Sequence, residues 1–419
     1  GFCFGVTIAE EIWHKNGPAA QQAKRGARLI ININAAPYHC DKTAEREKTV
    51  SRYCIENNIY VCYTNLVGGQ DELLFDGNSF LMDNRGHLIN TAEGFKESLL
   101  ITDIPVNERR TSKSSVVNIP HEITSKKSSI KTEKYVKPSI EQEVYSGLIT
   151  GVRDYMCKNG FKTAVLGLSG GIDSSLVATI AVDAMGKQNV IGVFMPSRYT
   201  SLISREDTYL LANNLGIRVL EISIDDIFNI YLKTLKPSFE GKGIDTTEEN
   251  LQARIRGNIL MALSNKFGYL VLITGNKSEM SVGYTTLYGD MAGGFGVIKD
   301  VYKTFVYRLS RYRNSIGQVI PERAITKAPT AELKPDQKDQ DTLPPYEILD
   351  SILKEYIEKE HSYRQIIEAG FDSKTVKKVL EMVDRNEYKR RQSPPGINLT
   401  PKAFGKDRRI PITNRYRLL

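Results

Sequence analysis

Two serines, two glycines and an aspartate lie close together in the stretch Ser169-Gly-Gly-Ile-Asp-Ser174. An apolar run, residues 163–168, ends just before it, and a helix-compatible segment begins at Asp173. Glycines permit close backbone approach, and the free amides at the start of a helix attract anions. A carboxylate would repel bare phosphate, so Asp173 indicates a divalent cation between the two. The stretch therefore predicts a site for a nucleotide and Mg²⁺.

A structural alternative is a glycine-rich turn in which Asp173 merely caps the helix. The serines and glycines at these spacings exceed what capping requires, which favours the binding site. The stretch is not a Walker A loop, because Gly-x4-Gly-Lys-Ser/Thr is absent, nor is it a dinucleotide fingerprint. It resembles the Ser-Gly-Gly-x-Asp-Ser loop of the ATP pyrophosphatases, enzymes that activate a carboxylate or carbonyl by adenylation.

The elements around this stretch alternate between apolar strand-like runs and helix-length segments. Such alternation predicts an α/β fold with a doubly wound parallel sheet that binds ligands at the carboxyl ends of its strands. A Ser-x-x-Asp pattern at Ser204–Asp207 suggests a capping box. The predicted strands are 163–168, 190–195, 218–222 and 269–274, and the predicted helices are 173–185, 204–215, 248–267 and 345–359.

Further polar residues should reach the same edge of the sheet. Arg198 follows the second strand and can border a nucleotide, although a plain surface loop is the alternative. Asn250 and Arg254 lie one helical turn apart, where an arginine clamps phosphate or belongs to a solvated face. Thr274 is at the end of the last strand, and Glu279 comes five residues later.

Glu279 should meet Asp173, and two carboxylates with phosphate oxygens and water form a suitable Mg²⁺ shell. A glycine-rich loop, residues 283–296, follows and is typical of loops that close over a substrate. Within it Asp290 can accept a hydrogen bond, and Lys303 beyond it can neutralise transferred phosphate.

The order of these motifs over most of the chain resembles NAD+ synthetase. The resemblance implies a ligase that adenylates the carboxylate of deamido-NAD+ with ATP, releases pyrophosphate, and uses ammonia to displace AMP. The further matching segments are Ala328–Leu333, Gln340–Tyr346, Asn386–Gly396 and Phe404–Thr413.

The resemblance also implies roles for the residues named above. Asp173, Glu279 and Lys303 would be catalytic, with Asp173 and Glu279 as the ligands of Mg²⁺. The residues expected to contact ATP are Ser169, Gly170, Gly171, Ser174, Arg198 and Thr274. Those expected to contact deamido-NAD+ are Asn250, Arg254 and Asp290.

Residues 1–105 show a second α/β pattern and resemble the latter half of a nitrilase-type glutaminase domain. The resemblance rests on Ile8–Trp13, Asn34–Tyr38, Val67–Ser79 and Asp83–Gly86. Ala9 stands at the position of the family's nucleophilic cysteine, and a methyl group cannot attack an amide. We therefore expect a truncated glutaminase domain that cannot hydrolyse glutamine, in which Ala9 arose either by natural decay or by engineering.

Residues 106–137 are rich in serine and lysine without apolar periodicity, and are expected to be a linker to a synthetase domain, 138–419. The C-terminal basic runs, at Lys389 and Lys406, are expected on a tail along the domain surface. The net charge of +8 favours anionic partners. We expect nucleotides rather than nucleic acid, since aromatic residues do not alternate with the charges.

No apolar run approaches the length of a membrane span, so we expect a cytoplasmic protein without a membrane partner. We also expect a homo-oligomer. Another ATP pyrophosphatase, such as GMP synthetase or a tRNA-modifying thiolase, is an alternative function. A nucleotide-binding scaffold that has lost catalysis is another. The complete loop at Ser169–Ser174 argues against the scaffold.

Overall fold

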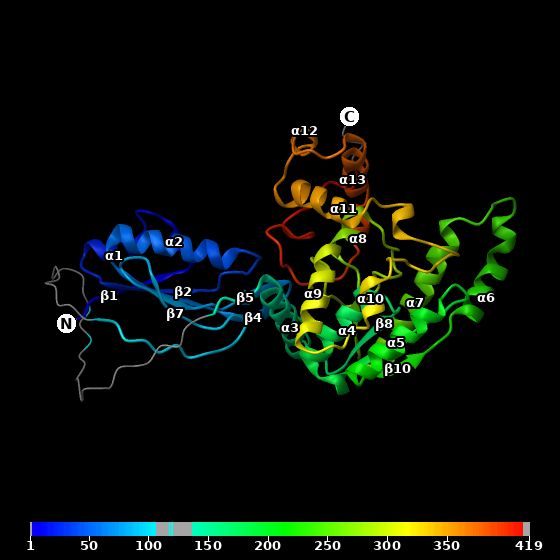
Figure 1. The fold of residues 1–419 in the computed structure, drawn as a ribbon, viewed down its shortest axis with the longest axis horizontal. Helices are drawn as coiled ribbons and strands as arrows, with labels where there is room; N and C mark the ends of the chain where they lie inside the picture. Colours follow the sequence, from blue (N-terminus) through cyan, green and yellow to red (C-terminus); the bar gives the residue numbers. More distant parts are fainter. Residues whose placement is uncertain (1, 106–116, 118, 120–135, 414–419) are drawn as a thin grey trace. The chain divides into compact units, whose positions relative to one another are not determined.

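The computed structural model describes residues 2–105, 117, 119 and 136–413, so most of the expected linker lies outside the described residues. The chain forms two compact units (Figure 1). A short segment of the N-terminal sequence, Gly69–Leu73, belongs to the second unit. The first unit comprises Gly1–Gly68 and Leu74–Gly147, and the second comprises Gly69–Leu73 and Leu148–Leu419.

The first unit contains a five-stranded sheet in the order β1-β2-β3-β6-β7. The first three strands run parallel, and β6 and β7 are antiparallel to their neighbours. The strands are β1 (Phe4–Ile8), β2 (Leu29–Asn34), β3 (Tyr60–Asn65), β6 (Phe80–Met82) and β7 (Leu88–Thr91). A separate two-stranded ribbon consists of β4 (Val67–Gln70) and β5 (Leu73–Asp76).

Two helices, α1 (Pro18–Lys24) and α2 (Lys42–Asn57), cover one face of this sheet. Their apolar residues pack against alternate strand residues such as Ile30, Val61 and Tyr63, which are fully buried. The α/β pattern predicted for this part of the chain is therefore confirmed.

The second unit contains a five-stranded sheet in the order β10-β9-β8-β11-β12, with every pair parallel. Chain order reverses at β8, which lies between β9 and β11, so the sheet has a topological switch point there. The predicted doubly wound parallel sheet is confirmed. The strands are β8 (Ala164–Leu168), β9 (Val190–Phe194), β10 (Arg218–Glu221), β11 (Leu270–Ile273) and β12 (Phe295–Gly296).

Helices cover both faces of this second sheet. Apolar residues of α6 and α7 pack against Val165, Val193 and Val271, while α4 contacts β8 and β9 from the other side (Figure 1). The helices are α3 (Ile140–Lys158), α4 (Ile172–Met185), α5 (Leu202–Leu215), α6 (Asp225–Leu235), α7 (Thr246–Phe267), α8 (Lys277–Val282), α9 (Lys303–Ile316) and α10 (Glu322–Thr326).

The suggested capping box at Ser204 is wrong. Helix α5 begins three residues earlier than this pattern implies, and its N-cap is Ser201, whose hydroxyl accepts a hydrogen bond from the Ser204 amide. Ser204 is instead a buried residue of the first helical turn.

The C-terminal region is helical and shares one apolar core. That core includes Val282 of α8, Leu349 and Ile352 of α11, and Val379 of α13. The helices are α11 (Tyr346–Leu353), α12 (Tyr363–Glu368), α13 (Ser373–Arg385) and α14 (Glu387–Arg390), and a π-helical turn (Lys354–Glu358) extends α11.

The expected surface position of the C-terminal tail is correct only in part. Lys406 is exposed, whereas Ile397 and Leu399 are each 1% exposed, so the chain directly after α14 is embedded in the second unit. Asp300 accepts hydrogen bonds from the amides of Leu399 and Thr400, which holds the segment against the residues before α9. Within residues 2–105 and 136–413 we find no helix with the length and apolar character that crossing a membrane requires.

Candidate active site

A cavity of about 620 Å³ opens at the carboxyl ends of β8, β9 and β11 in the second unit. Because these strands are parallel and in register, the loops that follow them meet at one edge. Most of the residues predicted for the site line this cavity. They are Ser169, Gly170, Gly171, Asp173, Ser174, Asn250, Thr274, Glu279, Asp290 and Lys303.

The glycine loop joins β8 to α4 by a left-handed turn. Gly170 has a φ of +72°, and a Cβ atom there would lie 2.3 Å from the backbone oxygen of Ser204. No other residue type fits without moving α5. The hydroxyls of Ser169 and Ser174 lie 3.1 Å apart beside the first amides of α4. Hydroxyl and amide donors of this kind form a site for anionic oxygens.

The two predicted metal ligands meet at one amine. The Lys303 ammonium donates to Asp173 and, at 3.2 Å, to Oε1 of Glu279. Asn276, the N-cap of α8, joins the same group: its amide nitrogen lies 3.0 Å from Oδ1 of Asp173, and its amide oxygen accepts from the Glu279 backbone at 3.0 Å. Residues separated by more than a hundred positions thus form one ionic cluster.

Burial and charge act in opposite directions on this cluster. Burial raises the pKa of Glu279, and Lys303 only partly offsets it because the Asp173 carboxylate raises it further. Burial alone would lower the pKa of Lys303, but Asp173 and Glu279 outweigh it, so the pKa of the amine is raised. Lys303 is therefore a permanent cation, and a further positive charge would favour ionised Glu279.

The cluster has the donor chemistry that Mg²⁺ prefers, since carboxylate oxygens are hard ligands. In the part of the chain that the structure describes, no group of three or more His, Cys, Asp or Glu side chains is placed to hold a metal ion. Asp173 and Glu279 fit a cation that takes its remaining ligands from phosphate oxygens and water.

Two predicted residues lie across the cavity from the loop. Oδ1 of Asn250 accepts from the Thr286 hydroxyl at 2.7 Å, and Oδ1 of Asp290 accepts from the Thr286 amide at 2.6 Å. The protein surrounding the cavity desolvates Asp290 and raises its pKa to about 6, although backbone amides oppose the shift. Thr286 therefore fixes both polar side chains.

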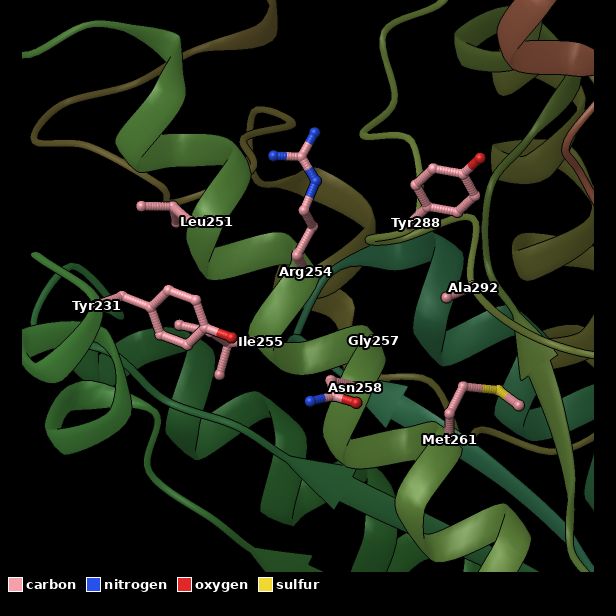
Figure 2. A pocket seen from close by; sticks show the side chains of 9 residues that line it. All are labelled: Tyr231, Leu251, Arg254, Ile255, Gly257, Asn258, Met261, Tyr288 and Ala292. Atoms are coloured by element: carbon pink, nitrogen blue, oxygen red, sulfur yellow. The ribbon is translucent and has the colours of Figure 1, made fainter. Parts of the chain in front are cut away.

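Arg254 lies in a second, adjoining cavity of about 390 Å³. Figure 2 shows Arg254 projecting from α7, with Tyr231 on one side of it and Tyr288 on the other. Its Nε atom donates to the Leu287 carbonyl at 3.2 Å. Gly257 and Ala292 line both cavities, so the two spaces share a wall.

Arg198 lies outside both cavities. Its guanidinium donates to Asp225 at 3.3 Å and to Asn229 at 2.6 Å, and its side chain is 43% exposed. This position gives no support to the expected contact with ATP.

Several charged residues that line the cavity were not predicted for it, and they include Arg256, Lys327, Asp339 and Lys389. Nε of Arg256 donates to the Met195 carbonyl at 3.0 Å, and burial lowers the pKa of this guanidinium to about 10. Lys389 donates to the carbonyls of Gly283 and Thr285.

Arg256 lies two residues after Arg254 on the same helix, and this spacing is a sequence signal that could have found it. Lys389 lies in a basic run that resembles solvated charge, so the sequence gave no signal that it reaches the cavity.

The first unit retains a turn at the expected nucleophile position. Ala9 follows β1 with a φ of +49° and begins a short 3-10 helix, η1 (Ala9–Trp13). The amide of Asn32 donates to the Ala9 carbonyl at 3.3 Å. The methyl side chain offers no nucleophile, whatever the geometry of the turn.

A parallel sheet with a switch point, a Ser-Gly-Gly-x-Asp-Ser loop beside it and an acidic pair at the same edge define the class of ATP pyrophosphatases. The family described as carbon-nitrogen hydrolase matches residues 1–113, and the family described as NAD synthase matches residues 144–393.

Named relatives match nearly the whole chain. A glutamine-dependent NAD(+) synthetase of Thermotoga maritima is 50% identical over 99% of this chain and 75% of its own length. Its counterpart in Aquifex aeolicus is 48% identical over 99% of this chain and 76% of its own length. The chain belongs to the glutamine-dependent NAD(+) synthetase family.

A solved structure extends the comparison. The glutamine-dependent NAD+ synthetase of Acinetobacter baumannii, in complex with ADP, is 44% identical with a TM-score of 0.68, and the match covers 98% of this chain and 72% of that one.

Proposed function

We propose that this chain is a ligase that makes NAD+ from deamido-NAD+, ATP and ammonia, with residues 138–419 as the synthetase domain and 1–105 as a glutaminase-like domain. The observation that carries the proposal is the convergence of Asp173, Glu279 and Lys303 beside the glycine loop in one cavity. The chain's membership of the family supports it.

The reaction requires activation, because a carboxylate is a poor electrophile. An oxygen of the substrate carboxylate attacks the α-phosphorus of ATP, a new O–P bond forms, and the bond to pyrophosphate breaks. Ammonia then attacks the acyl carbon, the C–O bond to AMP breaks, and the nitrogen loses a proton. Lys303, a buried permanent cation, stabilises the negative charge that develops on the phosphate oxygens.

ATP takes the part of the cavity beside the loop. The hydroxyls of Ser169 and Ser174 and the amides of Gly170 and Gly171 bind the pyrophosphate portion, and Thr274 lies at the end of the neighbouring strand. Donors that are fixed before the substrate arrives need no reorganisation during the reaction.

Asp173 and Glu279 would hold Mg²⁺. A cation held there would supply positive charge that stabilises the phosphate groups of ATP. Burial is the main cause of the raised pKa of Glu279, and a cation beside the carboxyl group would favour its ionised form.

Deamido-NAD+ would extend from the large cavity into the adjoining one. Asn250 and Asp290 would contact it near the reacting carboxylate, and Arg254 would bind a phosphate further along. Gly257 and Ala292 line both cavities, so the two spaces are close enough for a dinucleotide to contact residues of each.

A comparison of two nitrogen donors tests whether Ala9 prevents the use of glutamine. The purified chain is assayed for NAD+ formation from deamido-NAD+, ATP and Mg²⁺ with either ammonium or glutamine. We expect turnover with ammonium and none with glutamine, because Ala9 has no nucleophilic atom.

Turnover with glutamine would contradict the argument from Ala9. An absence of turnover with ammonium would refute the ligase itself and favour a nucleotide-binding scaffold. Omission of Mg²⁺ is the control for the proposed cation, and activity that persists in excess chelator would remove it from the site.

We also propose that the chain forms a homo-oligomer. Exposed apolar side chains gather near the cavity of Arg254, namely Ile230 of α6, Tyr231 and Tyr288. Light scattering after size exclusion gives the mass directly, and a mass of one chain at assay concentration would refute this proposal.

A further inference from the structure

A buried carboxylate outside the cavity connects the two elements that carry the ionic cluster. Asp350 of α11 is 2% exposed and accepts a hydrogen bond from the Ser278 hydroxyl. Its other oxygen accepts from the Thr304 amide at 2.9 Å. Ser278 precedes Glu279 in α8, and Thr304 follows Lys303 in α9. Asp350 therefore accepts hydrogen bonds from the residue before Glu279 and from the residue after Lys303.

The side chains of Ser278 and Asp350 also accept hydrogen bonds from the first backbone amides of α9. The first amides of a helix lack partners within the helix, and Tyr302, the N-cap of α9, offers no side-chain acceptor. Instead, the Ser278 hydroxyl accepts from the Lys303 amide at 2.9 Å, while Asp350 accepts from the Thr304 amide. A carboxylate is also favourable near a helix N-terminus. Residues of α8 and α11 thus cap α9.

The helix that carries Asp350 is well anchored. Leu349, Ile352 and Leu353 are fully buried in the C-terminal core. One turn before Asp350, the Tyr346 ring lies 5.4 Å from the Lys303 amine, and its hydroxyl donates to Asp339 at 2.8 Å. One face of α11 therefore contacts the Lys303 amine through Tyr346 and the neighbouring Thr304 amide through Asp350.

We propose that Asp350 is a positioning residue for the adenylation step. By capping α9 and holding Ser278, it keeps the Lys303 amine within hydrogen-bond distance of the Glu279 carboxyl group. Asp350 does not line the cavity, so it acts through these neighbours and not on the substrate. The inference rests on the proposed ligase function.

The test separates turnover from binding in Asp350→Ala and Asp350→Asn. A misplacement of about 1 Å costs up to about 10²-fold in rate, so we expect kcat for pyrophosphate release to fall by about 10²-fold in Asp350→Ala. The KM for ATP should change by less than about threefold, because the glycine loop is untouched. Asp350→Asn keeps one acceptor oxygen and should lie between Asp350→Ala and the wild type.

A substitution at a second buried carboxylate, Asp207, is the control for an effect of lost stability on the rate. Asp207 is 1% exposed and bonds to Arg323, not to a residue of α8 or α9. Asp207→Ala should lower the melting temperature while leaving kcat within about threefold of the wild type, since surplus stability does not set the rate of a folded enzyme. All rates are measured well below each variant's melting temperature, and Asp350→Asn serves if Asp350→Ala does not fold.

Ser278→Ala completes the test. Ser278 and Asp350 act in one chain of hydrogen bonds, so the double variant should lose little more kcat than Asp350→Ala alone. Additive losses in log kcat would overturn the proposal, as would an Asp350→Asn variant with wild-type kcat or a loss confined to KM. A wild-type protein that releases no pyrophosphate would instead refute the proposed function, so the two failures are distinguishable.

Discussion

Each of the two units contains a strand, a left-handed turn and a helical segment in succession, but the side chains around the two turns differ. In each, a parallel strand runs into a residue with left-handed φ and then into a helical segment: β1 leads to Ala9 at +49° and η1, and β8 leads to Gly170 at +72° and α4. Both turns present backbone and side chain at the end of a strand. Only the second is followed by hydroxyls, carboxylates and an amine that converge.

The difference shows that backbone geometry and chemical competence are separate properties. The turn at Ala9 carries only a methyl group, and the surrounding strand and the hydrogen bond from Asn32 hold it. The loop at Gly170 requires glycine, because any Cβ there would meet the backbone of Ser204. A turn with left-handed φ therefore does not by itself make a reactive site, since the side chains around it decide which chemistry is available.

The largest effect is expected from Asp173→Asn in the second unit. Neutralising this carboxylate removes one of two expected Mg²⁺ ligands and one partner of Lys303. We expect pyrophosphate release to fall by about 10²–10³-fold, as for removal of one fixed electrostatic contact in an active site.

The matched control in the first unit is Asp76→Asn, a buried carboxylate paired with Arg46. It should leave turnover with ammonium near the wild-type value. If Asp173→Asn retains activity, Asp173 has no role at the metal site, and the contrast between the units fails.

A smaller effect is expected from Gly170→Ala. The new methyl group would lie 2.3 Å from the Ser204 carbonyl, so α5 or the loop must move. Holding a residue in a poorly populated backbone conformation costs about 1–3 kcal/mol. We expect the free energy of unfolding, measured with denaturant, to fall by this amount, and the KM for ATP to rise. Gly268→Ala, with a φ of +70° and open space around the added Cβ, isolates the backbone strain from the clash. Equal effects at both positions would show that the contact with Ser204 is unimportant.

The smallest effect is expected from the opposite substitution in the first unit, Ala9→Gly. Glycine adopts a φ of +49° without the penalty that alanine suffers, and the Ala9 side chain is exposed, so little packing is lost. We expect a gain of about 1 kcal/mol in the stability of the first unit and no change in turnover with ammonium. Unfolding followed by hydrogen exchange at β1 measures this gain, and a loss of stability would mean that the Ala9 methyl group makes a contact worth more than the strain.

Much of the second unit could be predicted because its signals are local. Apolar strands, the glycine loop and the helix that follows each occupy a short window, and parallel pairing then brings the ends of β8, β9 and β11 to one edge. Asp173 and Glu279 followed from this rule. Arg198 also follows a strand, yet Asp225 and Asn229 hold its guanidinium elsewhere, and strand order carries no information about such bonds.

The sequence by itself determined the fold class, the glycine loop, the acidic pair and the alanine at position 9, since each depends on residue identity at short spacing. Only the tertiary structure decided that Lys389 reaches the cavity, that Leu399 after α14 is buried and that Asp350 caps α9 beside Lys303. These contacts join residues 46 to 106 positions apart, and their formation depends on the packing of whole helices.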